Sequence, residues 1–277
     1  MTRISAIYIY PIKSLGGIEL NASAITRRGL EHDRRWMLVD EKNEFLTQRA
    51  YPQMALLKTA INIDSIIVYH CNKPEDVIKL PLYPAAKETI TVRVWDDYCE
   101  AQYAAEAINK WFTQKLGIGC KAVYMPDESK RKLDPDYALS AEDITSFSDG
   151  YPILLVSEAS LEDLNSKLQI AVPMDRFRPN IVITGTNAFA EDTMKHFTIN
   201  HSNFYGVKLC GRCAVTTTNQ QTGERGKEPL KTLASYRTIN NKVCFGQNII
   251  CESGGKISVG DEIIIIETAA AGKIISL

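Results

Sequence analysis

Two cysteines three positions apart are the residues whose types and spacing best suit chemistry. The stretch "LCGRCAVTTT" places Cys210 and Cys213 around Arg212, with a threonine-rich run behind them. Such a pair could form half of a zinc site, a redox-active C-x-x-C turn, or a single reactive thiolate beside a cation. It could also be two buried cysteines that act as small hydrophobic residues. The remainder of the chain has to discriminate among these four possibilities.

Zinc and thioredoxin-type chemistry are the two weaker possibilities. Structural zinc usually takes four ligands from two close pairs, but the cysteines that follow, Cys244 and Cys251, have six residues between them in a strand-like segment. Alternation along such a strand sends their side chains to opposite faces. A thioredoxin-type pair needs a helix directly after it, whereas residues 214–218, Ala-Val-Thr-Thr-Thr, predict a strand. Buried thiols and a single thiolate beside Arg212 remain open.

Basic and short polar side chains recur at the ends of predicted strands. In "YPIKSLGG", Lys13 and Ser14 lie between a strand and two glycines, a combination that can cradle a phosphate although it is not a Walker loop. Further bases and an amide lie at comparable positions in both halves of the chain: Arg34, Arg35, Arg49, Arg176, Arg178 and Asn180. Each alone is more often a surface charge or a turn cap. Together they predict a multiply charged ligand between the halves.

The elements that must position these residues are mostly short strands. In the first half, strands are expected over 3–12, 34–40, 44–49 and 89–96, with two more within 53–70. A helix is expected over 104–116, closed by Gly117, and another after a serine cap at Ser157 or Ser160. In the second half, strands are expected over 151–156, 179–185, 197–210, 213–218, 243–252 and 262–267.

The expected fold class is mainly β with a few helices, an α+β arrangement in two domains. The first strands predict a small antiparallel barrel or curled sheet, which we assign to residues 1–126. The second domain is expected over residues 127–277. Its first part, 127–150, is polar and rich in turn-forming residues, so we expect a linker or long loop there.

Composition excludes several classes of protein. A net charge of −1 gives no overall field that would draw the chain onto nucleic acid or an acidic membrane. The start of the sequence lacks the features of a secretory signal, and no apolar run is long enough to span a bilayer. Seven cysteines, an odd number without framework spacing, suggest reduced thiols. We therefore expect a soluble cytoplasmic protein that binds neither nucleic acid nor membrane.

An ordered set of motifs resembles the MOSC superfamily over nearly the whole chain. The motifs are "YPIKS", "DRRWMLVD", "FLTQRAYPQMALL", "VSEASLEDLNSKL", "FRPNIVITG", "CGRCAVTTTNQQTGERGKEPLKTLASYR" and "FGQNIICESGGKISVGDEI". Within that superfamily the chain is most similar to the mitochondrial amidoxime reducing components and their bacterial relatives. The resemblance implies an N-terminal β-barrel domain packed on a β-barrel-rich MOSC domain. It also implies a molybdopterin cofactor between the two, with one cysteine bound to molybdenum.

The resemblance assigns roles to individual positions. The cysteine of the family's R-C-x-x-T-T pattern matches Cys213, which becomes the expected molybdenum ligand and catalytic residue, with Cys210 as its neighbour. A soft thiolate suits a metal that already binds dithiolene sulfurs. The implied contacts to the phosphate or pterin are Lys13, Ser14, Arg34, Arg178 and Asn180. Four weaker candidates are Thr47, Arg49, Ser157 and Arg212.

The implied activity is reduction of small N-hydroxylated or N-oxide compounds by a molybdenum enzyme. We expect neither the ferredoxin domain, which needs a C-x4-C-x2-C run, nor the membrane anchor found in some relatives, since the sequence shows no such features. Electrons are therefore expected from a separate ferredoxin-, flavodoxin- or cytochrome-type protein with its reductase. None of the four histidines has a spacing that marks it as the proton donor. The alternative is a carrier of the cofactor, or of sulfur as a persulfide on Cys213.

Overall fold

Strands dominate the structure. The computed structural model describes residues 1–85 and 88–269 of the 277-residue chain. Its described part contains three α-helices, which are α1 (Glu106–Leu116), α2 (Glu158–Asn165) and α3 (Leu230–Tyr236). The predicted fold class, mainly β with a few helices, is therefore confirmed. None of the described helices has the length and apolar character needed to cross a membrane.

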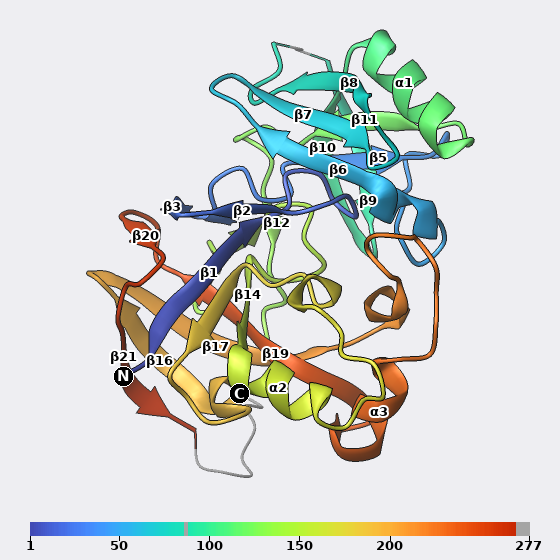
Figure 1. Ribbon diagram of the computed structural model, residues 1–277. Coiled ribbons are helices and arrows are strands. Elements are labelled where there is room, and N and C mark those ends of the chain that lie inside the picture. The colour runs from blue at the N-terminus through green and yellow to red at the C-terminus, as the bar shows by residue number, and fades with distance from the viewer. Residues whose placement is uncertain (86–87, 270–277) are drawn as a thin grey trace.

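One block of the molecule is built on a nine-stranded sheet that takes strands from both ends of the chain. In spatial order they are β2 (Ile18–Leu20), β1 (Arg3–Ile9), β15 (Ile181–Thr184), β14 (Ile153–Ser157), β19 (Lys242–Cys251), β17 (Ser202–Gly211), β16 (Met194–Ile199) and β21 (Ile263–Thr268), with β18 (Thr238–Ile239) on β19. The β14–β15 pair is parallel, and β1 pairs with β15 antiparallel. The first strand thus lies among strands of the second half (Figure 1).

The other block holds two smaller sheets and α1. We call it the first block, because its strands come from the first half of the chain, and we call the block with the nine-stranded sheet the second block. The four-stranded sheet contains β5 (Trp36–Val39), β11 (Lys121–Tyr124), β10 (Asp97–Tyr103) and β9 (Thr89–Val94), and the three-stranded sheet contains β6 (Leu57–Ile61), β7 (Ser65–His70) and β8 (Lys73–Pro81). Figure 1 shows these strands together with α1 at one end of the molecule, apart from the large sheet.

Short elements complete the chain between and beside the sheets. Five are strands, β3 (Ala22–Thr26), β4 (Gly29–Leu30), β20 (Lys256–Ser258), β12 (Arg131–Lys132) and β13 (Ile144–Thr145). Four are 3₁₀ turns, η1 (Pro52–Leu56), η2 (Met174–Arg176), η3 (Ala190–Thr193) and η4 (Ala214–Thr217). The predicted linker, 127–150, therefore carries two very short strands, which pair with each other.

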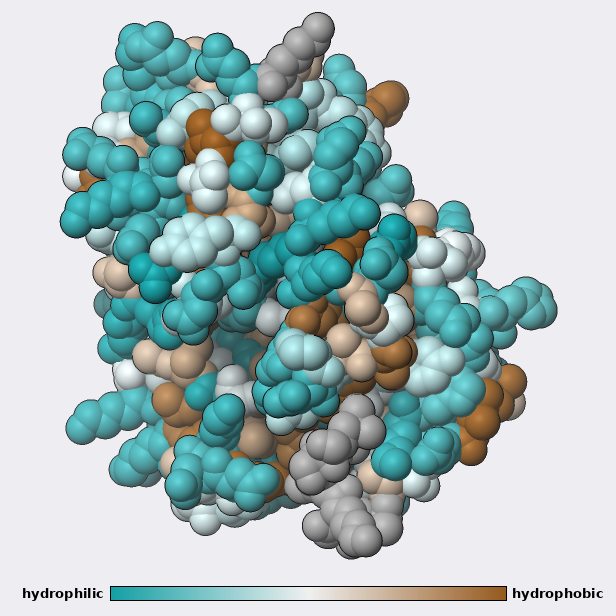
Figure 2. Space-filling model, turned by 180° about the vertical axis from the view of Figure 1, so that it is seen from behind, coloured by the Kyte–Doolittle hydropathy of each residue, from teal (hydrophilic) through white to brown (hydrophobic). Residues whose placement is uncertain are grey.

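Each block has its own apolar core. Helix α1 buries Ile108, Phe112 and Leu116 against the first block, as the helical spacing of these residues predicts. Gly117 follows in the left-handed conformation (φ 69°) that closes a helix, which confirms the predicted cap. In the second block, buried side chains of the large sheet, such as Phe197 and Phe204, form a separate cluster. The opposite face of the molecule is mostly hydrophilic, with apolar side chains in small groups (Figure 2).

The prediction of a strand over 213–218 is wrong, because residues 214–217 form the 3₁₀ turn η4 and Thr218 makes only an isolated bridge. The hydroxyl of Thr216 donates to the carbonyl oxygen of Cys213 at 3.0 Å, and that of Thr217 donates to Ala214 at 2.8 Å. Such local bonds from threonine side chains give the backbone an alternative to strand pairing. The β propensity of the threonine run is outweighed by these contacts.

Three further expectations differ from the structure. Residues 44–49 form turns with isolated bridges instead of a strand, and the carbonyl oxygen of Thr47 accepts hydrogen bonds from the turn that follows. Helix α3 was not anticipated, because its seven residues are too few for a clear helical period. Strands β1 and β2 join the large sheet although they precede the first block in sequence. The division into domains at residues 126 and 127 stays a prediction, and residues 270–277 lie outside the described part.

Candidate functional site

A cavity between the two blocks collects nearly all of the predicted site residues. Nine of the ten line it together: Lys13, Ser14, Arg34, Thr47, Arg49, Arg178, Asn180, Arg212 and Cys213. Cys210 also lines it. Ser157 does not: it is fully buried at the start of α2, where its hydroxyl accepts from the backbone N–H of Ser160 at 3.1 Å. The structure thus gives Ser157 the role of a helix cap, as the sequence pattern predicts.

Strained backbone turns carry two of the arginines into the cavity. Arg34 has φ 50° and Arg178 has φ 55°, values that favour glycine, and residues held there tend to gather at functional sites. Their guanidinium groups lie over the ring of Tyr10, at 4.5 Å and 4.2 Å from its centroid. Asn180 fixes Arg34 further, because its side-chain oxygen accepts from the guanidinium at 3.0 Å. The neighbouring Arg35 donates instead to Met125 and Asp127.

The lining is strongly cationic. Among its described residues are five cations, Lys13, Arg34, Arg49, Arg178 and Arg212, and one carboxylate, Asp149. Arg34 pairs with the buried Asp33 at 2.5 Å, and Lys13 pairs with Asp149 at 2.6 Å. Within the described part of the chain, the other three arginines have no carboxylate partner within 4.0 Å. A multiply charged anion would supply the negative charge that these three arginines do not receive from carboxylates of the described residues.

Two of these arginines also keep buried donors without acceptors. In the described structure, the Nη2 atom of Arg178 and the Nε atom of Arg212 have no hydrogen-bond partner. Burial, together with the nearby charge of Arg34, lowers the pKa of Arg178 to about 10. A buried donor without a partner costs free energy, so the site gains when an anion accepts from it.

The two cysteines occupy different elements at the cavity wall. Cys210 is the penultimate residue of β17, and Cys213 directly precedes η4. Arg212 donates to the sulfur of Cys210 at 3.0 Å and to the carbonyl oxygen of Phe177 at 2.6 Å. The sulfur that contacts the cation is thus Cys210, whereas the sequence interpretation placed the cation beside Cys213. Cys213 keeps a half-buried thiol in the same lining.

The structure does not bring the four late cysteines together as a metal site. No three His, Cys, Asp or Glu side chains among residues 1–85 and 88–269 gather closely enough to hold a metal ion. Cys251 points into the core of the large sheet, where its sulfur lies 3.8 Å from the carbonyl oxygen of Thr26. A donor set of two cavity thiols, Cys210 and Cys213, with several arginines instead fits a ligand that brings its own metal and phosphate.

Two residues of the lining, Trp95 and Asp149, were not among the predicted site residues. Trp95 is the first residue of the two-residue turn between β9 and β10, with φ 59°, a conformation that usually selects Asn or Gly. Its ring lies 3.9 Å from the guanidinium carbon of Arg49, and its indole N–H donates to Asp149 at 3.3 Å. A tryptophan at a turn position that usually selects Asn or Gly breaks a local sequence rule, and such departures tend to occur at functional sites.

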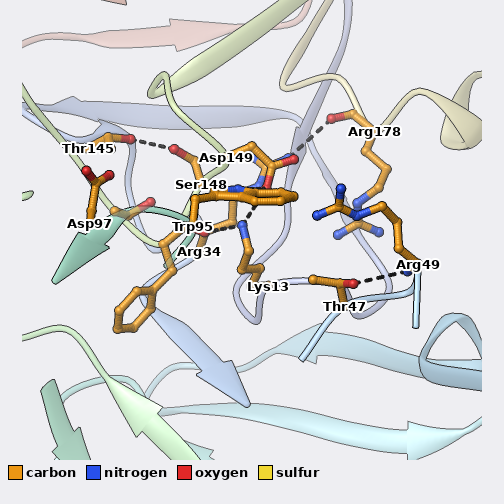
Figure 3. Close-up of polar contacts among 12 residues, drawn as sticks. Lys13, Arg34, Thr47, Arg49, Trp95, Asp97, Thr145, Ser148, Asp149 and Arg178 are labelled. Carbon is orange, nitrogen blue, oxygen red and sulfur yellow. Dashed lines mark hydrogen bonds and ion pairs between the residues drawn. The ribbon is translucent and has the colours of Figure 1, made fainter. Parts of the chain in front are cut away.

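Asp149 was missed because it lies in the predicted linker. Figure 3 shows its carboxylate facing Lys13 and Trp95. The segment that carries it, 146–149, is held by the buried Arg131. The guanidinium donates to three backbone carbonyl oxygens of that segment, at 3.0 Å (Ser146), 2.6 Å (Ser148) and 3.2 Å (Asp149). It also pairs with Asp97 of β10 at 2.8 Å, which ties the segment to the first block.

Comparison with known proteins identifies both halves of the chain. Residues 1–119 match the MOSC N-terminal beta barrel domain, and residues 142–264 match the MOSC domain. The chain is 32% identical to mitochondrial amidoxime-reducing component 1 of Mus musculus, over 95% of this chain and 82% of that protein. It is equally identical to a molybdenum cofactor sulfurase of Arabidopsis thaliana, over 94% of this chain but 35% of that protein. Among solved structures, YUAD of Bacillus subtilis aligns over 95% of this chain and 94% of its own, at 12% identity and a TM-score of 0.44.

Proposed function

The chain belongs to the MOSC family, with its N-terminal and MOSC domains, and from this premise we propose that it binds a molybdenum–molybdopterin cofactor and reduces N-hydroxylated or N-oxide compounds. The observation that carries the proposal is one cavity that combines the thiol of Cys213 with three arginines lacking carboxylate partners among the described residues. A cofactor with a phosphate and a thiolate-seeking metal needs these two kinds of group.

The residues divide into anchors and supports in this proposal. Arg49, Arg178 and Arg212 would bind the anionic end of the cofactor, because their charges are not yet matched. Ser14 and Thr47 offer hydroxyls in the same lining. Asn180 and Tyr10 hold Arg34 and Arg178 in place and need not contact the cofactor themselves. Cys213 would ligate the metal, and the bound metal would supply the two-electron redox chemistry.

We propose that the substrate and the electrons both come from outside the chain. We propose a small N-oxygenated substrate, which has to enter the cavity beside Cys213. The electron donor would be a separate ferredoxin-, flavodoxin- or cytochrome-type protein with its reductase. The seven free cysteines suit a reducing compartment, so we propose a cytoplasmic location.

The test of this function compares two neighbouring thiols. Cys213→Ala and Cys210→Ala proteins, each purified from a host that produces the cofactor, are assayed for reduction of a model amidoxime with an artificial electron donor. We expect the change at Cys213 to abolish turnover and the change at Cys210 to leave most of it. Turnover that survives in Cys213→Ala would show that the ligand assignment is wrong.

A carrier function is the second candidate, because the chain is as similar to a molybdenum cofactor sulfurase as to a reductase. In this case Cys213 would hold a persulfide, or the protein would carry the cofactor to another enzyme. The contact between Arg212 and Cys210 places a cation at the cysteine pair, which favours anionic sulfur. Metal-free protein with persulfide on Cys213 would support the carrier, and bound molybdenum with a pterin chromophore would support the reductase.

A further inference from the structure

Arg176 differs from Arg178, two residues further along the same segment, because it does not line the cavity. It is 8% exposed, and its guanidinium donates to two backbone carbonyl oxygens. Nε donates to Thr216 of η4 at 2.8 Å, and Nη2 donates to Glu228, two residues before α3, at 3.1 Å. The sequence predicts Arg176 as part of a charged-ligand site, but the structure directs it to the protein's own backbone.

The residue that accepts from Arg176 is bonded in turn to Cys213. The hydroxyl of Thr216 donates to the carbonyl oxygen of Cys213 at 3.0 Å, and the backbone N–H of Thr216 donates to the same oxygen at 3.2 Å. Thr216 is 1% exposed, so water does not readily replace these bonds. A continuous set of hydrogen bonds therefore runs from the buried guanidinium to the backbone of the cavity cysteine.

The residue between the two arginines holds the chain on the other side of Cys213. The carbonyl oxygen of Phe177 accepts from Arg212 at 2.6 Å. Phe177 is itself fixed, because its buried ring stacks on that of Phe245 with the centroids 4.1 Å apart. Residues 176–178 thus bind the chain both before and after Cys213, and we call this segment the bracket.

The charge of Arg176 is costly for the fold. Among the described residues, no carboxylate lies within 4.0 Å of its guanidinium. Burial lowers the pKa of Arg176, and the charge of the neighbouring Asp175 acts in the opposite direction. A buried charge without a carboxylate partner costs free energy. A residue that remains there at such a cost indicates a role beyond packing.

We propose that Arg176 is a positioning residue, which holds η4 so that the thiol of Cys213 stays at a fixed place relative to the guanidinium of Arg178. The bracket thereby sets the separation between a phosphate-binding cation and the metal ligand. This purpose rests on the proposed function, because it takes Cys213 as the ligand of molybdenum. A cofactor that carries its phosphate and its metal on one frame binds best where both protein groups are already in place.

The test replaces Arg176 and a matched arginine elsewhere in the chain. Arg28 is also 8% exposed, and its guanidinium donates to the backbone carbonyl oxygens of Asp127 and Ser129, outside the cavity lining. Arg176→Met and Arg28→Met each remove one buried guanidinium and keep an unbranched apolar stem. Urea denaturation of both variants establishes that the proteins compared are folded.

The main readout is the rate at which iodoacetamide alkylates each cysteine in protein made without the cofactor. Trypsin cleaves after arginine and lysine, so it cuts the chain between the two cavity cysteines at Arg212. Cys210 and Cys213 therefore fall in separate peptides, which mass spectrometry quantifies independently. The second readout, which needs no turnover, is the molybdenum content of protein from a host that produces the cofactor.

We expect Arg176→Met to raise the alkylation rate of Cys213 by about 10-fold or more, as the loss of one hydrogen bond to a charged group implies. The rate for Cys210 in the same sample, and both rates in Arg28→Met, should change by less than about twofold. Molybdenum content should fall in Arg176→Met, because groups that orient a metal ligand contribute about 10- to 100-fold to metal affinity. It should stay unchanged in Arg28→Met.

An unchanged alkylation rate of Cys213 in folded Arg176→Met would overturn the inference. An equal rise in Arg28→Met would do the same, because it would show general loosening of the fold. A full molybdenum content in Arg176→Met would refute the role of the bracket for the metal.

Two further comparisons keep the test decisive. If Arg176→Met does not fold, Thr216→Val removes only the hydroxyl bond to Cys213 and should raise the alkylation rate of Cys213; an unchanged rate would refute the bracket. An unchanged protein that carries no molybdenum would remove the proposed function and the metal-holding purpose with it. The alkylation rates need no cofactor, so they would still decide whether Arg176 positions Cys213.

Discussion

Arg49 is the plainest case of an unmatched charge in the lining of the cavity. Its guanidinium lies on the ring of Trp95, and it has no carboxylate partner among the described residues. Arg93, in the neighbouring strand β9, is similar in chemistry but different in setting, because it pairs with Glu44 at 3.3 Å and lies over Tyr98. At the residue scale, the difference between a matched and an unmatched charge separates structural arginines from candidate anchors.

This contrast predicts the effect of removing each charge. Arg49→Gln should weaken the binding of inorganic pyrophosphate by about 1.5–3 kcal/mol, the usual strength of a hydrogen bond to a charged group, or roughly 10- to 100-fold in Kd. Arg93→Gln should change it little, since that guanidinium lies outside the cavity lining. Isothermal titration calorimetry at low salt measures both. Equal weakening in the two variants would mean that pyrophosphate responds to overall charge and not to the cavity.

Segment 146–149 is the element that determines the shape of one cavity wall. It has almost no regular structure, so its position depends on Arg131, whose guanidinium binds three of its carbonyl oxygens and Asp97. The backbone N–H of Phe147 also donates to the carbonyl oxygen of Arg34 at 3.0 Å. Side-chain and backbone hydrogen bonds thereby fix a segment that has no sheet partner of its own.

Arg131→Met should therefore lower the free energy of unfolding strongly. Losing one partner of a buried charged network typically costs 3–5 kcal/mol, and the exposed position of Asp97 favours the lower end, about 3 kcal/mol. Lys132→Met, an exposed neighbour in the same short strand, should stay within about 0.5 kcal/mol. Urea denaturation of both variants decides the matter. Similar losses in the two would show that Arg131 does not hold the segment.

Elements with a long period or a clear cap could be predicted from the sequence, and α1 with Gly117 is the clearest case. The turn η4 could not, because its threonine run has strand propensity and its outcome depends on hydroxyl bonds to the residues before it. The basic residues of the site were found because they recur at strand ends. Asp149 could not be found in this way, since its place in the cavity wall depends on contacts with Arg131 and Lys13, which are distant in sequence.

At the scale of the whole molecule, the cavity exists because the two blocks share chain segments. Strand β1 begins the sequence but pairs with β15 in the large sheet, and Lys13 and Ser14 follow it into the cavity. In the other direction, the buried Gln48 of the first block exchanges hydrogen bonds with Gln220 of the second, at 3.1 Å and 3.0 Å. Arg49 follows Gln48 directly, so the same contact positions an anchor. No sequence pattern within one block could reveal this arrangement.

The most direct test of the account is the molybdenum and pterin content of protein made in a host that produces the cofactor. We predict close to one molybdenum and one pterin per chain in the unchanged protein and in Cys210→Ser. Cys213→Ser should lose most of the metal, because a soft thiolate ligand is replaced by a hydroxyl. A purified protein that carries neither molybdenum nor pterin, or a Cys213→Ser protein that keeps its full molybdenum content, would contradict the central claim.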